Sequence, residues 1–370
     1  ISKAGPIFSI FQIFIHAIMT VVLMIFYCRL KIKPIISFIL ALIIGIHPSI
    51  VFYTTYLIAD YFMNVLITLS WLIFILLIEF IDSRRRKKYI FTFIFAILMG
   101  LTTITKVVWL YAFFPFVLFI LYRYRISKDS FIITFIIISI NFSFYSFWSL
   151  NKDKSEFKEL YSQSFYSINM GSIRTGLVEY GKGTELYNFL LEKKLLSHAK
   201  QCQGEDDENY RKIYWEVPVK LKENRAFSQK IIREVPFKFL MGQLSNWHTF
   251  FTKRMFSPND NAFPNMPNLI HYIYVGSFNN LYRPFLIPLL LSFIFLIKYQ
   301  HLRVIVISSL IVLFYYTILH TIFSATPGHF IRYRVAIEYI LFFVALLPIG
   351  LLIQNINFKK LKQILFFKNF

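Results

Sequence analysis

The sequence predicts an all-α polytopic membrane protein, and three observations lead to that prediction. Of the 370 residues, 57% are hydrophobic and only 16% are charged, whereas soluble domains average about 25% charged residues. The mean hydropathy is +0.57, and apolar stretches of about twenty residues, the length that crosses a bilayer as a helix, recur along the chain. Because these stretches are continuously apolar and do not alternate with polar residues, they exclude an outer-membrane barrel.

Nine apolar stretches are candidate spans, most of them near the length that a crossing helix needs. The run from Tyr89 to Tyr122 is too long for one crossing and is interrupted at Lys106, so we expect a hairpin of two short helices there. The nine spans are Ile7–Cys28, Ile35–Val51, Leu57–Ile81, Tyr89–Thr105, Val107–Tyr122, Phe131–Leu150, Pro284–Ile297, Leu302–Phe323 and Val335–Ile353.

Cations between the spans predict the orientation of the chain. Apart from the long hydrophilic stretch 151–280, the chain has 22 Lys and Arg residues. Seventeen of them lie in every second connection between spans or in the C-terminal tail, and we expect this side to be cytoplasmic. The N-terminus is then outside and the C-terminus inside. Aromatic residues at the predicted outer ends fit an interfacial belt; these are Trp109, Trp148, Tyr53, Tyr56 and Tyr61.

The same orientation divides the chain into three parts. Residues 1–150 hold six spans, residues 151–283 form a hydrophilic extracytoplasmic loop domain, and residues 284–370 hold three spans and a basic cytoplasmic tail. Most of the net charge of +21 lies in short clusters between spans, which orient helices and exclude a groove for nucleic acid. The loop domain has no Asn-x-Ser/Thr acceptor site, which favours a bacterial inner (plasma) membrane.

Charged residues at the predicted outer face need a reason, because a charge at membrane depth costs about 2.5–3.5 kcal/mol even on the gentler scales. Asp60 opens the third span. It is either an acid stabilised by the helix dipole or a carboxylate that faces an outer cavity. Lys106 is either a lysine that extends to the interface or a contact for an anion, with threonine hydroxyls beside it.

Arg332 and Arg334 precede the last span and break the positive-inside pattern, which favours an anion site. A guanidinium binds phosphate oxygens through two parallel hydrogen bonds. Glu338 lies four residues after Arg334 and can pair with it along the helix, so Arg332 is the freer cation. Polar residues inside the spans are expected to form hydrogen bonds between helices; these are His16, His320, Asn141 and Gln12.

Three stretches of the predicted outer face follow an order known from one membrane family. They are His47-Pro48…Tyr53…Asp60, Gly100-Leu101…Thr105-Lys106…Pro115, and Arg332-Tyr333-Arg334…Glu338…Pro348-Ile349-Gly350. In these stretches the chain resembles the GT-C fold glycosyltransferases that use polyprenyl-phosphate sugars. The likeness is closest to the protein O-mannosyltransferase and aminoarabinose transferase type, and it extends over almost the whole chain.

The resemblance implies a GT-C-like helix bundle and an inverting transfer of a sugar from a polyprenyl-phosphate donor. The acceptor would be a lipid, a protein or a glycan, and membrane lipids would surround the enzyme. Asp60 matches the family's second acidic position and would be catalytic. Lys106, Arg332 and Arg334 would bind the donor phosphate. The supporting residues would be His47, Tyr53 and Glu338.

One departure from the family concerns the beginning of the chain. The family's principal catalytic acid lies in a first outer loop that follows a first helix, and the sequence has neither before Ile7. Because the chain also begins with Ile1 instead of Met, we expect this helix and loop to precede it, and the chain as given to lack that acid.

Two other function classes stay open: a transporter or lipid-linked-glycan flippase, and a polysaccharide polymerase or ligase. A transporter usually shows internal repeats, and none is visible. The sequence has no nucleotide-binding, zinc-protease or serine-hydrolase motif. It identifies no cofactor, shows no metal-ligand spacing, and leaves open whether a divalent metal is needed.

Overall fold

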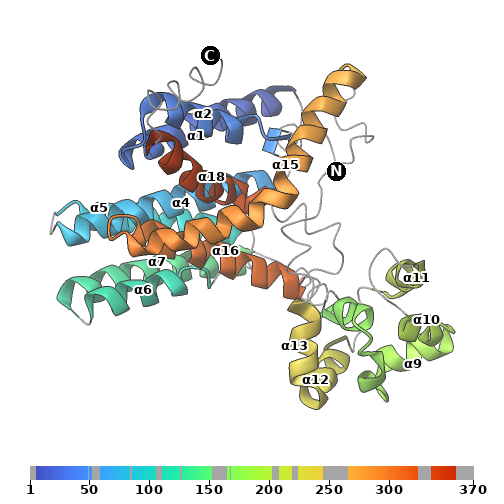
Figure 1. The fold of residues 1–370 in the computed structure, drawn as a ribbon. Coiled ribbons are helices and arrows are strands. Elements are labelled where there is room, and N and C mark those ends of the chain that lie inside the picture. Colours follow the sequence, from blue (N-terminus) through green and yellow to red (C-terminus); the bar gives the residue numbers. More distant parts are fainter. Residues whose placement is uncertain are drawn as a thin grey trace. The chain divides into compact units, whose positions relative to one another are not determined.

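The computed structural model describes residues 6–48, 50–51, 59–83, 86–105, 111–125, 127–151, 165–166, 168–201, 208–218, 224–244, 266–323 and 335–355. Within these ranges every regular element is a helix (Figure 1). The chain divides into two compact units. The first contains Ile1–Asn141, Arg254–Leu313 and Val335–Phe370, and the second contains Phe142–Lys253 and Phe314–Arg334.

Four described helices are long and apolar enough to cross a membrane, as expected for an all-α membrane protein. All four begin in the first unit. Its helices are α1 (Pro6–Arg29), α2 (Pro34–Gly45), α4 (Ala59–Asp82), α5 (Lys88–Thr105), α6 (Phe114–Tyr124), α7 (Lys128–Asn151), α15 (Asn268–Phe295), η3 (Leu296–Lys298), α16 (Arg303–Phe323), η4 (Val335–Ile337) and α18 (Glu338–Asn355). Helices α7 and α16 continue into the second unit.

Helix α4 is the most enclosed of the four candidate spans. The buried share of its most apolar window is 67%, against 17% for α1. The indole of Trp71 donates a hydrogen bond to Ser308 Oγ of α16 over 3.0 Å. The ring of Phe74 packs against Phe95 of α5 and Phe116 of α6, with centroids 5.4 and 4.6 Å away. Because lipid gives helices no hydrophobic reason to associate, such close side-chain packing and hydrogen bonds hold them together.

The interruption predicted in the long run from Tyr89 to Tyr122 is confirmed. Helix α5 ends at Thr105 and α6 begins at Phe114, with a proline in the first turn of α6. Proline suits that position because the first turn leaves its N–H groups without helical partners anyway.

Several helix boundaries differ from the sequence prediction; α6 begins at Phe114 instead of Val107. Helix α2 ends at Gly45 instead of Val51, because Pro48 cannot donate to the helix and disfavours the helical conformation just before it. Helix α15 begins at Asn268, well before the predicted Pro284. Hydropathy marks only apolar segments, so the polar first half of α15 gave no signal.

Ion pairs join the helices at one end of the first unit, where α1 and α4 finish and α5 and α7 begin. We call it the ion-paired end. Arg123 of α6 donates to Asp82 of α4 over 2.9 Å, and Tyr124 donates to the same carboxylate over 2.7 Å. The remaining pairs are Arg29–Glu79 and Lys88–Asp129. Glu79 and Asp82 thus each join two helices.

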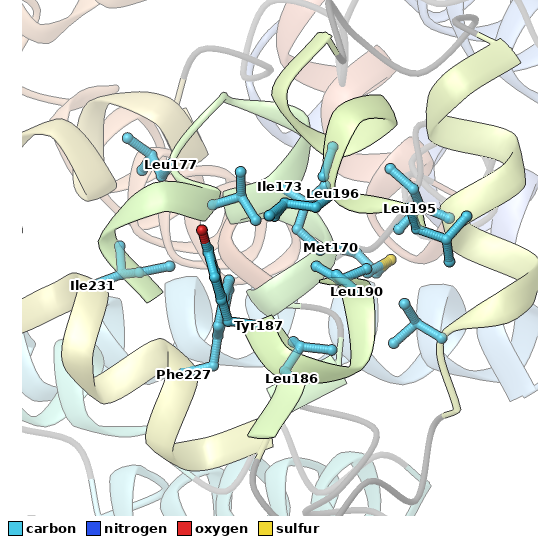
Figure 2. Packing of buried hydrophobic residues seen from close by; sticks show 14 of the residues in the cluster. Met170, Ile173, Leu177, Leu186, Tyr187, Leu190, Leu195, Leu196, Phe227 and Ile231 are labelled. Carbon is cyan, nitrogen blue, oxygen red and sulfur yellow. The ribbon is translucent and has the colours of Figure 1, made fainter. Parts of the chain in front are cut away.

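The second unit has its own apolar core. Its elements are η2 (Val178–Gly181), α9 (Glu185–Glu192), α10 (Leu196–Gln201), α11 (Glu208–Glu216), α12 (Asn224–Glu234) and α13 (Pro236–Leu244). Figure 2 shows Leu186, Tyr187 and Leu190 of α9 in one cluster with Phe227 and Ile231 of α12. Helix α9 begins where Thr184 accepts a hydrogen bond from the Tyr187 N–H, an N-cap that satisfies one unpaired donor.

Candidate functional site

The first unit buries a group of polar side chains at the end where α2 finishes and α4 and α18 begin. We call it the polar end. His16 of α1 is at its centre: one ring nitrogen, Nε2, lies 2.6 Å from the carbonyl oxygen of Gly45, and the other, Nδ1, contacts the hydroxyl of Tyr339. A carbonyl only accepts, so Nε2 carries the proton. In the neutral ring Nδ1 then accepts from the Tyr339 hydroxyl.

Close contact between α1 and α2 makes the His16 interaction possible. A Cβ at Gly45 would lie 2.8 Å from the Thr20 hydroxyl oxygen, so a larger residue would push the two helices apart. The Thr20 hydroxyl in turn donates to the His16 carbonyl over 3.0 Å. The predicted role of His16 as a hydrogen-bonder between helices is therefore confirmed.

Two tyrosines extend the polar end to α4 and α18. Tyr61 donates to the carbonyl of Gln12 over 3.2 Å. The Tyr339 N–H donates to Asn64 Oδ1 over 3.3 Å, so the start of α18 is attached to the first half of α4. Tyr61, Asn64 and Tyr339 are all 0% exposed.

The expected aromatic belt is wrong for two of its members. Tyr61 is fully buried in the polar end, and Trp148 is 8% exposed and stacks on Tyr145. Neither side chain faces the headgroup level, because each packs against protein. Tyr53, Tyr56 and Trp109 lie outside the described residues.

Two of the predicted supporting residues lie at this end of the first unit. His47 follows the end of α2, is 7% exposed and packs its ring 4.1 Å from that of Phe342 in α18. Glu338 is the first residue of α18 and is 0% exposed. An acid in a helix's first turn is favoured by the partial positive charge there.

The remaining predicted site residues are described only in part. Asp60 lies in the first turn of α4, and its side chain is outside the described part of the structure. The other four predicted residues are outside the described ranges altogether: Tyr53, Lys106, Arg332 and Arg334.

The arrangement brings two acidic positions to the same end of two packed helices. Asp60 directly precedes Tyr61, and Glu338 directly precedes Tyr339. The 3₁₀ turn η4 before Glu338 also contacts α4. Carboxylates placed in a poorly solvated site can take up protons from a reacting group. Sequence reasoning did not single out Tyr339 or Asn64, because nothing in the sequence says which helices are neighbours.

The second unit carries a groove of about 380 Å³ that the sequence did not indicate. Its lining includes Trp215, which is 81% exposed. An exposed indole beside ammonium groups can bind a ligand by stacking and by charge. The other lining residues are Lys193, Leu195, Lys212 and Glu216. Among the described residues of the whole chain, no group of three or more His, Cys, Asp or Glu could hold a metal ion.

Comparison with known proteins gives no match for this chain: no protein family, no curated protein and no solved structure is similar to it.

Proposed function

We propose that the protein is a membrane glycosyltransferase of the GT-C type, which transfers a sugar from a polyprenyl phosphate to an acceptor at the outer face of a bacterial inner membrane. The observation that supports this proposal most is the hydrogen bonding of α18 to α4, which brings the positions of Asp60 and Glu338 to one buried polar end. In this proposal residues 151–283 are the extracytoplasmic domain, and the acceptor is a lipid, a protein or a glycan.

The proposed reaction is a direct displacement with inversion. The acceptor hydroxyl oxygen bonds to the anomeric carbon while the bond from that carbon to the phosphate oxygen breaks, and its electron pair leaves with the polyprenyl phosphate. The carboxylate of Asp60 assists in taking up the acceptor proton. Cations stabilise the charge on the departing phosphate; these are Lys106, Arg332 and Arg334.

His47 and Glu338 have supporting roles in this proposal. The imidazole of His47 is buried against Phe342, which holds the segment between α2 and α4 against α18. Glu338, four residues after Arg334 in the sequence, would pair with that guanidinium and orient it. Tyr53 lies between His47 and Asp60 in the sequence and would line the acceptor's path.

Transfer of labelled sugar in membranes that contain the protein at its full natural length tests this function. Asp60→Asn should lower transfer, by a factor of up to about 10²–10⁴, because a carboxylate that assists removal of the acceptor proton is lost. Lys106→Ala and Arg332→Ala should also lower it. Asp82→Asn is the matched control for Asp60→Asn, since Asp82 ends the same helix α4 at its other end; it should leave the rate unchanged.

Two outcomes would contradict the proposal. Unchanged transfer in Lys106→Ala and Arg332→Ala would remove the phosphate site. Movement of the labelled lipid across the membrane by wild-type protein, with no transfer to any acceptor, would identify a flippase instead.

A further inference from the structure

Helix α13 of the second unit exposes an apolar face. The large apolar side chains of this face are Phe237, Leu240 and Met241, which are 73%, 44% and 52% exposed. They are spaced i, i+3 and i+4, so they lie on one side of the helix. We call these three residues the apolar face of α13. An exposed stripe of large apolar side chains on a helix indicates an interaction surface.

The opposite side of α13 is fixed to the core of its own unit. Phe239 is 9% exposed within that core, and the amide of Gln243 donates to the Ile168 carbonyl over 3.3 Å. A Cβ at Gly242 would lie 2.9 Å from Thr175 Oγ1, so the helix touches its neighbour closely. Because of these contacts α13 cannot turn its apolar face inward without breaking the core.

Basic residues lie close in sequence to the apolar face of α13. Arg233 and Lys238 are exposed on α12 and α13, and the segment from Asn224 to Leu244 has four cations against the single acid Glu234. A basic amphipathic surface is complementary to a bilayer that contains anionic phospholipid, and each cation near such a surface contributes about 1 kcal/mol.

Chain connectivity ties the second unit to a helix long enough to cross a bilayer. Helix α7 is one of the four helices long enough to cross a membrane, and its last residues already belong to the second unit. A short helix with three apolar side chains would bind lipid weakly by itself. Its attachment to a crossing helix raises the effective concentration of lipid around it.

We propose that the apolar face of α13 inserts into the boundary between headgroups and acyl chains of the membrane that α7 crosses, with α13 lying in the plane of the interface. Phe237, Leu240 and Met241 contact acyl chains, while Arg233 contacts lipid phosphates. Lys238, whose ammonium donates to the Tyr180 hydroxyl over 3.3 Å, adds to the positive charge beside them. This membrane contact is independent of the glycosyltransferase proposal, since it requires only a membrane-embedded chain.

Spin labels on the full protein in lipid nanodiscs test the contact. Phe237→Cys, Leu240→Cys and Met241→Cys are made one at a time with Cys28 and Cys202 replaced by serine, and each cysteine is labelled with a nitroxide. Leu191→Cys on α9 is the matched control, since Leu191 is an apolar residue of the same unit and is 58% exposed. Power saturation measures collisions of each label with oxygen, which concentrates in lipid, and with a water-soluble nickel chelate.

The three α13 labels should collide several-fold more with oxygen, relative to the nickel chelate, than the Leu191→Cys label. The difference should grow when phosphatidylglycerol is added to phosphatidylcholine discs, and the double variant Arg233→Glu/Lys238→Glu should remove that growth. Labels as accessible to nickel as the control would overturn the proposal. Labels reached by neither reagent would also overturn it, because protein would then cover the face.

Discussion

The two ends of the first unit hold their helices together with different chemistry. At the ion-paired end, Arg123 and Asp82 join α6 to α4 across 2.9 Å, and their side chains are 33% and 43% exposed. At the polar end, Tyr339 is 0% exposed and contacts His16 through a bond between neutral groups. Both ends connect helices far apart in the sequence, but Tyr339 is fully buried at the polar end, whereas Arg123 and Asp82 both stay partly exposed.

The contrast predicts different energetics for the two ends. Solvent already stabilises exposed charges, so an exposed ion pair contributes about 0–1 kcal/mol. A buried hydrogen-bonding group that loses its partner costs about 1–3 kcal/mol, because no water replaces the bond. We therefore expect the polar end to contribute more to stability, although its hydrogen-bonding groups are neutral and those of the ion-paired end are charged.

Tyr339→Phe should give the largest loss, about 1–3 kcal/mol of unfolding free energy, because it leaves His16 Nδ1 without its donor. The measurement is equilibrium unfolding in mixed detergent micelles, followed by circular dichroism. Tyr122→Phe is the control: Tyr122 is 87% exposed, so removing its hydroxyl should change little.

A double-mutant cycle separates the hydrogen bond from general packing. On a His16→Leu background, Tyr339→Phe should cost clearly less than it does in the wild type, because the partner is already gone. Equal costs on both backgrounds would show that the bond between His16 and Tyr339 contributes nothing.

Asp82→Asn should give a smaller loss, under about 1 kcal/mol, because Arg123 and Tyr124 can turn to water. Raising the salt concentration should shrink the loss further, since ions screen exposed charges, whereas the loss for Tyr339→Phe should not depend on salt. If Asp82→Asn lowered the unfolding free energy as much as Tyr339→Phe and the loss did not depend on salt, the two ends would not differ as described.

Local sequence signals predicted much of the helical framework. The length of one apolar run and its break at Lys106 predicted two helices, and the structure has α5 and α6 there, although α6 begins at Phe114 instead of Val107. The cost of a polar group in a membrane also predicted that His16 would bond between helices. Its partners could not be predicted, because Tyr339 is 323 residues away in sequence, and periodicity does not say which helices touch.

The candidate site shows the same limit. The predicted spans Ile35–Val51 and Val335–Ile353 included His47 and Glu338, whereas the structure has His47 just after the end of α2 and Glu338 at the start of α18. The burial of Glu338 and the bond from Tyr339 to Asn64 arise from packing of distant segments, which no local pattern encodes. The roles of Asp60, Lys106, Arg332 and Arg334 stay predictions, since they depend on side chains outside the described part of the chain.

An ion pair of the second unit extends the comparison. Its removal should change the stability less than the other substitutions do. Lys200 Nζ lies 2.6 Å from Glu179 Oε1, and both side chains are about half exposed. The hydrogen bond from Lys200 lowers the pKa of Glu179 from its ordinary 4.5, and the same bond raises the pKa of Lys200 from its ordinary 10.5.

The directions of the two pKa shifts fix the pH dependence of this pair. A lowered acid pKa stabilises the fold above pH 4.5, and that contribution disappears as Glu179 takes up its proton at lower pH. A raised lysine pKa stabilises the fold below pH 10.5, and that contribution disappears as Lys200 loses its proton at higher pH. Amide hydrogen exchange in α10, compared between the wild type and Lys200→Met at each pH, measures both contributions to stability. The extra protection of α10 amides in the wild type should be constant from about pH 5 to pH 10 and shrink on either side. Lys193→Met, compared with the wild type in the same way, should show no such pH dependence. Extra protection that grows in acid would contradict the ion pair.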